Sequence, residues 1–152
     1  MSSFVKISEG AALALHACAL LAQHPDDYFP VKTLAERLQG SSAHLSKVMQ
    51  RLAKTGLVTG LRGPKGGFYL ARPASEITLL EIFQAIEGTI APVDCVFDEP
   101  VCAWGHCLFR GMIPTLDQKF ADYLQGTTLS AIAAKSRSLP DRRKTVPSRK
   151  NA

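Results

Sequence analysis

The stretch from Ser41 to Leu70, SSAHLSKVMQRLAKTGLVTGLRGPKGGFYL, decides the fold of this chain of 152 residues. Apolar Leu45, Val48, Met49 and Leu52 recur at the i, i+3, i+4 and i+7 spacing of one helix face. The first half of the stretch therefore predicts an amphipathic helix with a buried stripe and a polar outer face.

The second half of the stretch predicts a β-hairpin. Gly56 is expected to end the helix in the left-handed conformation that glycine adopts easily. Two strands are predicted at Leu57 to Leu61 and Phe68 to Ala71, joined by the tip Arg62-Gly-Pro-Lys-Gly-Gly. Upstream, Val31 to Leu38 has helical spacing and precedes a tight turn. This order predicts a winged helix-turn-helix, which places its second helix in the major groove of DNA.

Charge is distributed unevenly along the chain, whose net charge is +5. Residues 32–72 hold eight basic side chains against Glu36 alone, whereas residues 73–126 hold eight acids against two basic residues. A merely solvated face would mix the two signs, whereas a basic stretch binds DNA by releasing counterions from phosphates. The outer helix face and the hairpin tip supply hydrogen-bonding groups for base edges and cations for phosphates. The residues expected to contact DNA are Ser42, His44, Ser46, Lys47, Gln50, Arg51, Lys54, Arg62 and Lys65.

Helices are predicted on both sides of this module. Ser8 to Gln23 is apolar on nearly every face, so it should be a buried helix that includes Cys18 as a core residue. Thr78 to Glu81 has the capping-box pattern that begins a helix ending at Gly88. From Phe109 to Gly126 apolar residues continue at helical spacing, with Pro114 either in the first turn or at a kink.

The expected fold is mainly α with a small β-wing, a winged helix-turn-helix followed by a C-terminal dimerisation helix. We expect a homodimer, because helices of this kind usually act in pairs on palindromic sites. The predicted divisions are a DNA-binding domain at 1–88, a cysteine loop at 89–108, a dimerisation region at 109–135 and a disordered basic tail at 136–152.

The N-terminus lacks the features of a secretory leader, and the apolar run from Gly10 to Ala22 is too short to span a bilayer. We therefore expect a cytoplasmic protein without membrane contact. Disulfides are rare in that reducing compartment, which favours metal ligation or thiol chemistry for the cysteines.

Cys95, Cys102 and Cys107 lie in one predicted loop, without the Cys-x-x-Cys spacing of a thioredoxin-like site or a usual zinc finger. This loose spacing favours an iron–sulfur cluster, which thiolates of a flexible loop can hold. Zinc with His106 as fourth ligand and a thiol redox switch remain alternatives, as does a zinc-binding interaction module. No nucleophile, base and orienting group form a recognisable set, so an enzyme is not expected.

The wing sequence LVTGLRGPKGGFYLAR, the helix sequence Ile77-Thr-Leu-Leu-Glu-Ile and the three-cysteine loop together resemble the IscR/NsrR type of bacterial winged-helix regulators. The resemblance runs from Val5 to about Lys135. It implies a homodimer that binds a pseudo-palindromic operator, as repressor or activator, and senses cluster status, iron, nitric oxide or redox state.

The resemblance also implies a [2Fe-2S] or [4Fe-4S] cluster held by the three loop cysteines. Arg110 stands three places beyond Cys107, where some members carry a histidine ligand, and it cannot serve. The candidate fourth ligands are Glu9, His16 and His106, with Glu9 ranked first.

Overall fold

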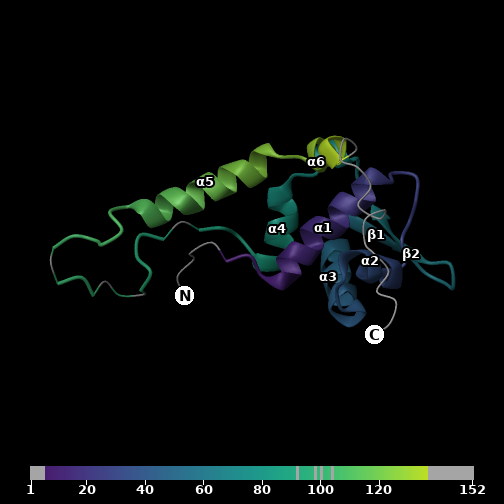
Figure 1. Cartoon of the computed structure of the whole chain (residues 1–152), viewed down its shortest axis with the longest axis horizontal. Coiled ribbons are helices and arrows are strands. Elements are labelled where there is room, and N and C mark those ends of the chain that lie inside the picture. Colours follow the sequence, from purple (N-terminus) through teal and green to yellow (C-terminus); the bar gives the residue numbers. More distant parts are fainter. Residues whose placement is uncertain (1–5, 92, 98, 100, 104, 137–152) are drawn as a thin grey trace, which may run out of the picture.

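The computed structural model describes residues 6–91, 93–97, 99, 101–103 and 105–136 (Figure 1). Most of the predicted basic tail lies outside these residues. The described elements are α1 (Glu9–Gln23), α2 (Val31–Leu38), α3 (Ser42–Lys54), β1 (Val58–Leu61), β2 (Gly67–Leu70), a short 3-10 helix η1 (Ala74–Glu76), α4 (Leu79–Glu87), α5 (Met112–Gly126) and α6 (Leu129–Ser136). The fold is mainly α with a small β-wing, as the sequence predicts.

Helix α1 is the centre of the core and contacts α2, α3, α4 and α6. Its Ala- and Leu-rich sequence lets these helices approach it from several sides, as predicted for a helix that is apolar all round. Ser8 caps its first turn by accepting a hydrogen bond from the Ala11 N–H at 3.1 Å. Cys18 is fully buried in this helix, and burial raises the pKa of its thiol to about 12. It is a core residue, as predicted.

The helix-turn-helix consists of α2, a turn and α3. Gln39 is left-handed, with φ of 55°, and Gly40 follows it. Ser41 then caps α3 by accepting a hydrogen bond from the His44 N–H at 3.3 Å. The predicted stripe of Leu45, Val48, Met49 and Leu52 is confirmed, because all four side chains are buried in the core. Gly56 adopts the expected positive φ, 75°, after the helix ends.

The wing is an antiparallel hairpin in which Val58 pairs with Leu70 and Leu61 with Gly67. Strand β2 has a second neighbour, since Phe29 and Phe68 exchange two backbone hydrogen bonds of 3.0 and 2.9 Å. A Cβ atom on Gly67 would lie 2.6 Å from the carbonyl carbon of Phe29, so only glycine permits this approach. The start of β2, near the tip of the wing, is thus anchored to the loop before α2.

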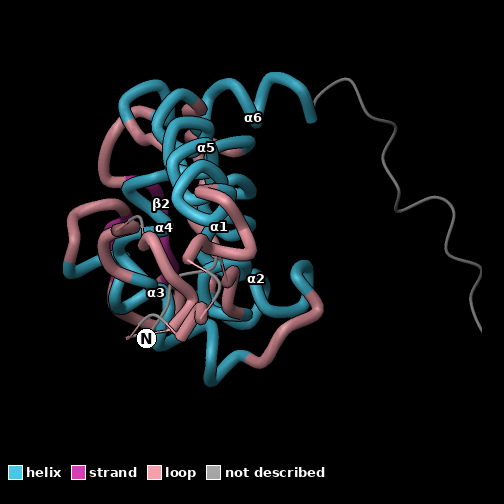
Figure 2. The backbone as a smooth tube through the Cα atoms, turned by 90° about the vertical axis from the view of Figure 1, so that its left-hand side faces the viewer, coloured by secondary structure: helices cyan, strands magenta, loops and turns pink. Residues whose placement is uncertain are grey.

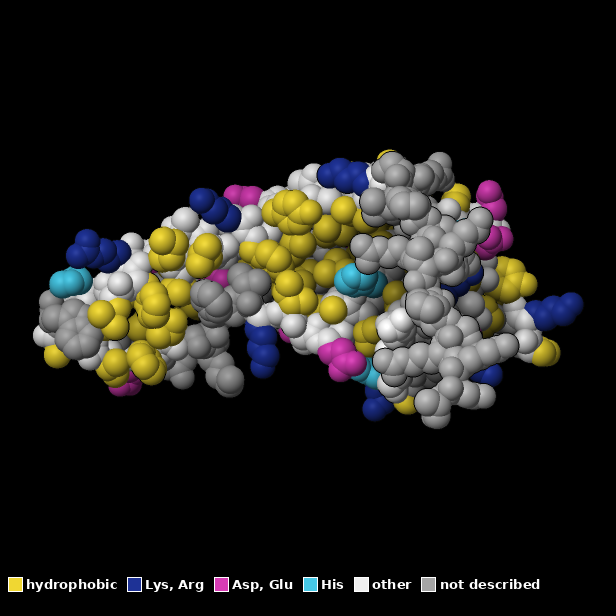
Figure 3. All heavy atoms as spheres, in the orientation of Figure 1, with side chains coloured by type: hydrophobic (Ala, Val, Ile, Leu, Met, Phe, Trp, Pro, Cys, Tyr) yellow, Lys and Arg dark blue, Asp and Glu magenta, His cyan; other side chains and the backbone are white. Residues whose placement is uncertain are grey.

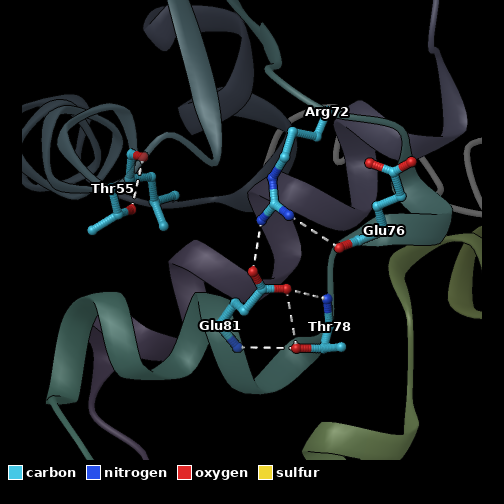
Figure 4. Close-up of polar contacts among 6 residues, drawn as sticks. Thr55, Arg72, Glu76, Thr78 and Glu81 are labelled. Carbon is cyan, nitrogen blue, oxygen red and sulfur yellow. Dashed lines mark hydrogen bonds and ion pairs between the residues drawn. The ribbon is translucent and has the colours of Figure 1, made fainter.

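Helix α4 begins with the predicted capping box (Figure 4). The Thr78 hydroxyl accepts from the Glu81 N–H at 3.3 Å, and the Glu81 carboxylate accepts from the Thr78 N–H at 2.9 Å. Arg72, next to the wing, also donates to the other Glu81 oxygen at 2.6 Å. Burial raises the pKa of Glu81, but the hydrogen bond from Thr78 and the nearby Arg72 guanidinium outweigh it, so the pKa lies below its ordinary value.

Helix α5 projects from the core as an arm: it begins far from the core and runs back to it, where α6 follows (Figure 1). It begins at Met112 rather than at the predicted Phe109, because Arg110 and Gly111 have left-handed backbone with φ of 45° and 77°. Pro114 therefore lies in the first turn, the first of the two predicted alternatives. In the next helix Leu129 is fully buried in the shared core.

Candidate DNA interface and cysteine site

Helix α3 presents a polar outer face opposite its buried stripe. Two of the residues predicted to contact DNA, His44 and Ser46, are half-buried. The other predicted contacts on the helix are exposed, and they are Ser42, Lys47, Gln50, Arg51 and Lys54. The arrangement leaves hydrogen-bonding groups near the start of the helix and cations toward its end, which suits base edges and phosphates respectively.

Two side chains of this face also have partners within the chain. The Arg51 guanidinium donates to the backbone carbonyl oxygen of Ile86 in the last turn of α4, with an N–O distance of 2.9 Å. Nδ1 of His44 lies 3.8 Å from a carboxylate oxygen of Glu9, at the start of α1. The sequence pattern predicts neither contact, because the partners are far apart in the chain and one of them is a backbone atom.

The wing tip places Arg62 and Lys65 in solvent at the end of the hairpin. The backbone between them turns tightly: the Gly66 N–H donates to the Gly63 carbonyl at 2.9 Å. A Cβ on Gly66 would lie 2.3 Å from the Leu61 carbonyl oxygen. Glycine therefore holds the tip in a shape that carries both cations outward.

The three loop cysteines line one cavity of about 370 Å³. Cys95, Cys102 and Cys107 are each half-buried, and no disulfide joins them. The predicted His106 lines the same cavity, together with Asp94 and Gly105. The Phe109 N–H donates to the Cys107 sulfur at 3.4 Å. A hydrogen bond of this kind stabilises negative charge on a ligating sulfur.

The donor set of this cavity fits a thiolate-held group, although its side chains lie apart from one another. Among the described residues, no three His, Cys, Asp or Glu side chains are close enough to hold one metal ion. Glu9 and His16 line a separate cavity of about 300 Å³ beside Gln39 and Gly40. Within one chain the structure thus groups His106, and neither Glu9 nor His16, with the three thiols.

An apolar surface follows the loop and one side of α5, and we call it the apolar stripe. It consists of Phe97, Val101, Leu108, Phe109, Met112, Leu116 and Tyr123, all exposed. Figure 3 shows hydrophobic side chains gathered on this arm of the molecule. Monomeric proteins rarely expose a contiguous apolar surface of this size, so the stripe is suited to a protein–protein contact.

Asp117 is a charged residue on the buried face of α5, away from the apolar stripe. Its side chain is 1% exposed, and neither carboxylate oxygen has a hydrogen-bond partner in the part of the chain that the structure describes. It lies one turn from buried Ile113, and Leu124 continues the same face. The sequence pattern does not single out Asp117, because the apolar periodicity of the helix continues past it.

A winged helix-turn-helix with a basic reading helix defines a class of DNA-binding transcriptional regulators. Comparison with known proteins agrees with this class. The chain belongs to the Rrf2 family, described as iron-dependent transcriptional regulators, which residues 7–135 match. Transcriptional regulation is not an enzymatic role, in agreement with the prediction from sequence.

Individual relatives support the same assignment. The regulator IscR of Photorhabdus laumondii is 29% identical over 103 residues, which span 68% of this chain and 63% of that protein. The structure of CymR, the global cysteine regulator of B. subtilis, has a TM-score of 0.72 and 27% identity over 87% of this chain and 98% of that one. The structure of T. potens IscR, with 21% identity and a TM-score of 0.69, covers 94% of this chain and 98% of that chain and shares the fold.

In Figure 2, where the molecule is turned by 90° from the view of Figure 1, α5 lies in front of α1 and α4, and α3 lies at the lower edge.

Among the described residues, no helix has both the length and the apolar character needed to cross a bilayer.

Proposed function

We propose that this regulator binds its operator under the control of an iron–sulfur cluster held by Cys95, Cys102 and Cys107. The observation that carries the proposal is the cavity lined by all three thiols, with a backbone N–H already directed at the Cys107 sulfur. Thiolates are the usual ligands of such clusters, which supply electron exchange when bound. The iron-dependent description of the family supports the same assignment.

The fourth ligand is proposed to be one of Glu9, His16 and His106. His106 shares the cavity of the thiols, whereas the other two line a separate cavity in the same chain. Glu9 or His16 would therefore have to come from a second copy. Iron retention separates the cases. His106→Ala releases iron if the ligand is local, whereas Glu9→Ala or His16→Ala releases it if that residue of a second copy is the ligand.

A homodimer is proposed through the apolar stripe. Two copies joined there would bury exposed Met112, Leu116 and Tyr123 and present two recognition helices to one pseudo-palindromic operator. Tyr123→Lys should convert the dimer to monomer in size-exclusion chromatography with light scattering. Gln125→Lys, which introduces the same residue at an exposed position of α5 on the side away from the stripe, is the matched control.

In this proposal the DNA contacts are those predicted from sequence on α3 and the wing. Half-sites lie about 34 Å apart, so a small rotation of the two copies misaligns the helices and lowers affinity. The loop from Asp94 to Cys107 connects the winged helix to α5, so a change at its thiols would alter that spacing. We place the protein in the cytoplasm, where the DNA of a bacterial regulator lies.

DNA binding under different treatments tests the proposal. The probe is a fluorescent 30-base-pair duplex selected from a random pool by the anaerobically purified chain. Exposure of the protein to nitric oxide or oxygen should change the Kd of the protein for this duplex at least ten-fold. Cys102→Ser should abolish the response while leaving the chain folded. An equal response in Cys102→Ser would contradict the proposal.

A second candidate is a thiol-based regulator that needs no cluster. It is favoured by the separation of the thiols and by the likeness to CymR, including the oxidized form of S. aureus CymR at 26% identity and a TM-score of 0.70. In that case colourless, iron-free protein would still change its DNA affinity between reductant and peroxide.

A further inference from the structure

The hydrogen bond between Arg51 and Ile86 joins α3, the recognition helix, to the end of α4. The last carbonyl groups of a helix have no partner within it, and a cation is favoured at that end of the helix dipole. The Arg51 guanidinium meets both requirements by donating to the Ile86 oxygen at 2.9 Å. A residue that the sequence assigns to DNA contact thus has a partner inside the protein.

The start of α1 lies at the same junction. The Ser8 hydroxyl donates to the carboxylate of Glu87, the last residue of α4. A Cβ atom on Gly10 would lie 3.4 Å from Cγ2 of Ile86 and 3.6 Å from Nε2 of His44. The first turns of α1 and α3 and the last turn of α4 are therefore in close contact. A displacement of the end of α4 cannot leave α3 unaffected.

The cysteine segment begins directly after this junction. Gly88 follows α4 with φ of 84°, a conformation that turns the chain out of the helix toward Cys95. The carbonyl group that Arg51 holds is two positions before that turn. Movement of the segment would reach the recognition helix through the contacts between α3 and α4, which include this charged hydrogen bond, and through the packing around Gly10.

We infer that Arg51 is a positioning residue, which fixes the orientation of the recognition helix relative to the start of the cysteine segment. We call the pair of the Arg51 guanidinium and the Ile86 carbonyl the brace. The inference rests on the proposed function for its regulatory meaning, although the brace itself is a contact within one chain. Its competitor is the simpler role in which Arg51 only neutralises a DNA phosphate.

Salt dependence distinguishes the two roles. A phosphate contact contributes about 0.9 to the slope of log affinity against log salt, so its removal lowers the slope by that amount. Removing a positioning residue lowers affinity at every salt concentration and leaves the slope unchanged. Lys54, one turn along α3 and exposed, provides the comparison with a cation expected to meet phosphate.

The experiment uses the selected 30-base-pair duplex with the full-length variants Arg51→Gln, Arg51→Lys and Lys54→Gln. Arg51→Gln is expected to lose about ten-fold in affinity with the wild-type slope, because a recognition helix that is no longer held in place must be ordered when it binds DNA. Arg51→Lys should lose a similar amount, because a lysine keeps the charge but not the planar donor geometry. Lys54→Gln should reduce the slope by about 0.9.

A second measurement needs no DNA. Amide hydrogen exchange at the last turn of α4 and at Gly88 should be faster in both Arg51 variants than in the wild type and in Lys54→Gln. This result stands even if the wild-type chain selects no duplex or carries no cluster, so failure of the brace and failure of the proposed function are distinguishable. Circular dichroism checks that the variants are folded, and Arg51→Lys serves if Arg51→Gln does not fold.

The regulatory meaning is tested by the ratio of Kd values before and after nitric oxide. The ratio should fall toward one in Arg51→Gln and remain at the wild-type value in Lys54→Gln. A slope reduced by about 0.9 in Arg51→Gln, or unaltered amide exchange at the end of α4, would overturn the inference. If the wild-type chain responds to nitric oxide, an equal ratio in Arg51→Gln would overturn it as well.

Discussion

Replacing Asp117 is expected to stabilise the chain, which is the reverse of what most core substitutions do. Its carboxylate is 1% exposed and has no hydrogen-bond partner among the described residues. A buried polar group left without a partner costs about 1–3 kcal/mol. Asp117→Leu removes that cost and adds apolar surface to the buried face of α5 that includes Ile113 and Leu124. We expect the free energy of unfolding to rise by about 1–3 kcal/mol.

Urea unfolding at pH 7, followed by circular dichroism, measures this effect. Chain concentration must be held constant, because association also contributes to apparent stability. The midpoint should rise with an unchanged m-value, and Tm should rise by roughly 2–4 °C for each kcal/mol. Asp117→Asn should give a smaller gain, because it removes the charge but leaves an amide to be satisfied.

Asp122→Asn on the same helix is the control. Asp122 is exposed, and an asparagine oxygen can still accept the hydrogen bond from Gln118. Its effect should stay within about 0.5 kcal/mol. A loss of more than about 1 kcal/mol in both Asp117 variants would refute the reasoning, because it would mean that the carboxylate has a cationic partner in the assembled protein.

Three further predictions concern the helix cap and the cysteines. Thr78→Ala should lower the free energy of unfolding by about 1 kcal/mol in urea, since it removes the hydroxyl of the capping box. Glu81 has a lowered pKa in the folded state. The contribution of its carboxylate to the free energy of unfolding is therefore complete above the ordinary pKa of about 4.3 and is lost as the pH falls through the folded value. The difference in stability between wild type and Glu81→Gln should therefore be constant from pH 5 to 8, below about 1 kcal/mol for this half-exposed side chain, and shrink in acid. Iodoacetamide at pH 8 should leave Cys18 unmodified in folded apoprotein, because its pKa is about 12, and mass spectrometry should find the label on Cys95, Cys102 and Cys107.

The local pattern of the sequence was enough to predict the DNA-reading module. The four apolar residues of α3 follow a spacing that places them on one helix face, and all of them are buried: Leu45, Val48, Met49 and Leu52. The Thr78 and Glu81 pair likewise predicts its own helix start, because both partners lie within one turn. Such features need no knowledge of the rest of the chain.

Contacts between distant segments could not be predicted in this way. The partner of Arg51 is a backbone carbonyl 35 positions away, and no pattern of side chains identifies it. The late start of α5 depends on left-handed backbone at Arg110, a residue type without a preference for that conformation. The return of α6 to the core is fixed by backbone hydrogen bonds, such as that from the Leu129 N–H to the Ile77 carbonyl at 2.9 Å.

The sequence predicted which cysteines form the candidate site, but it predicted only part of how they are arranged. The loop spacing indicated that the three thiols act together, and they line one cavity. The sequence ranked Glu9 ahead of His16 and His106, but that choice depends on where the loop lies in space. The structure groups His106 with the thiols of its own chain, and the contribution of a second copy stays a prediction.

The central claim, that the three loop cysteines hold an iron–sulfur cluster, is tested most directly by the iron and acid-labile sulfide content of the anaerobically purified chain. The account predicts brown protein with visible absorption, iron and sulfide in at least two equivalents each per cluster site, and loss of both in Cys102→Ser. Colourless wild-type protein without sulfide, whether it carries one zinc ion per chain or no metal, would contradict it.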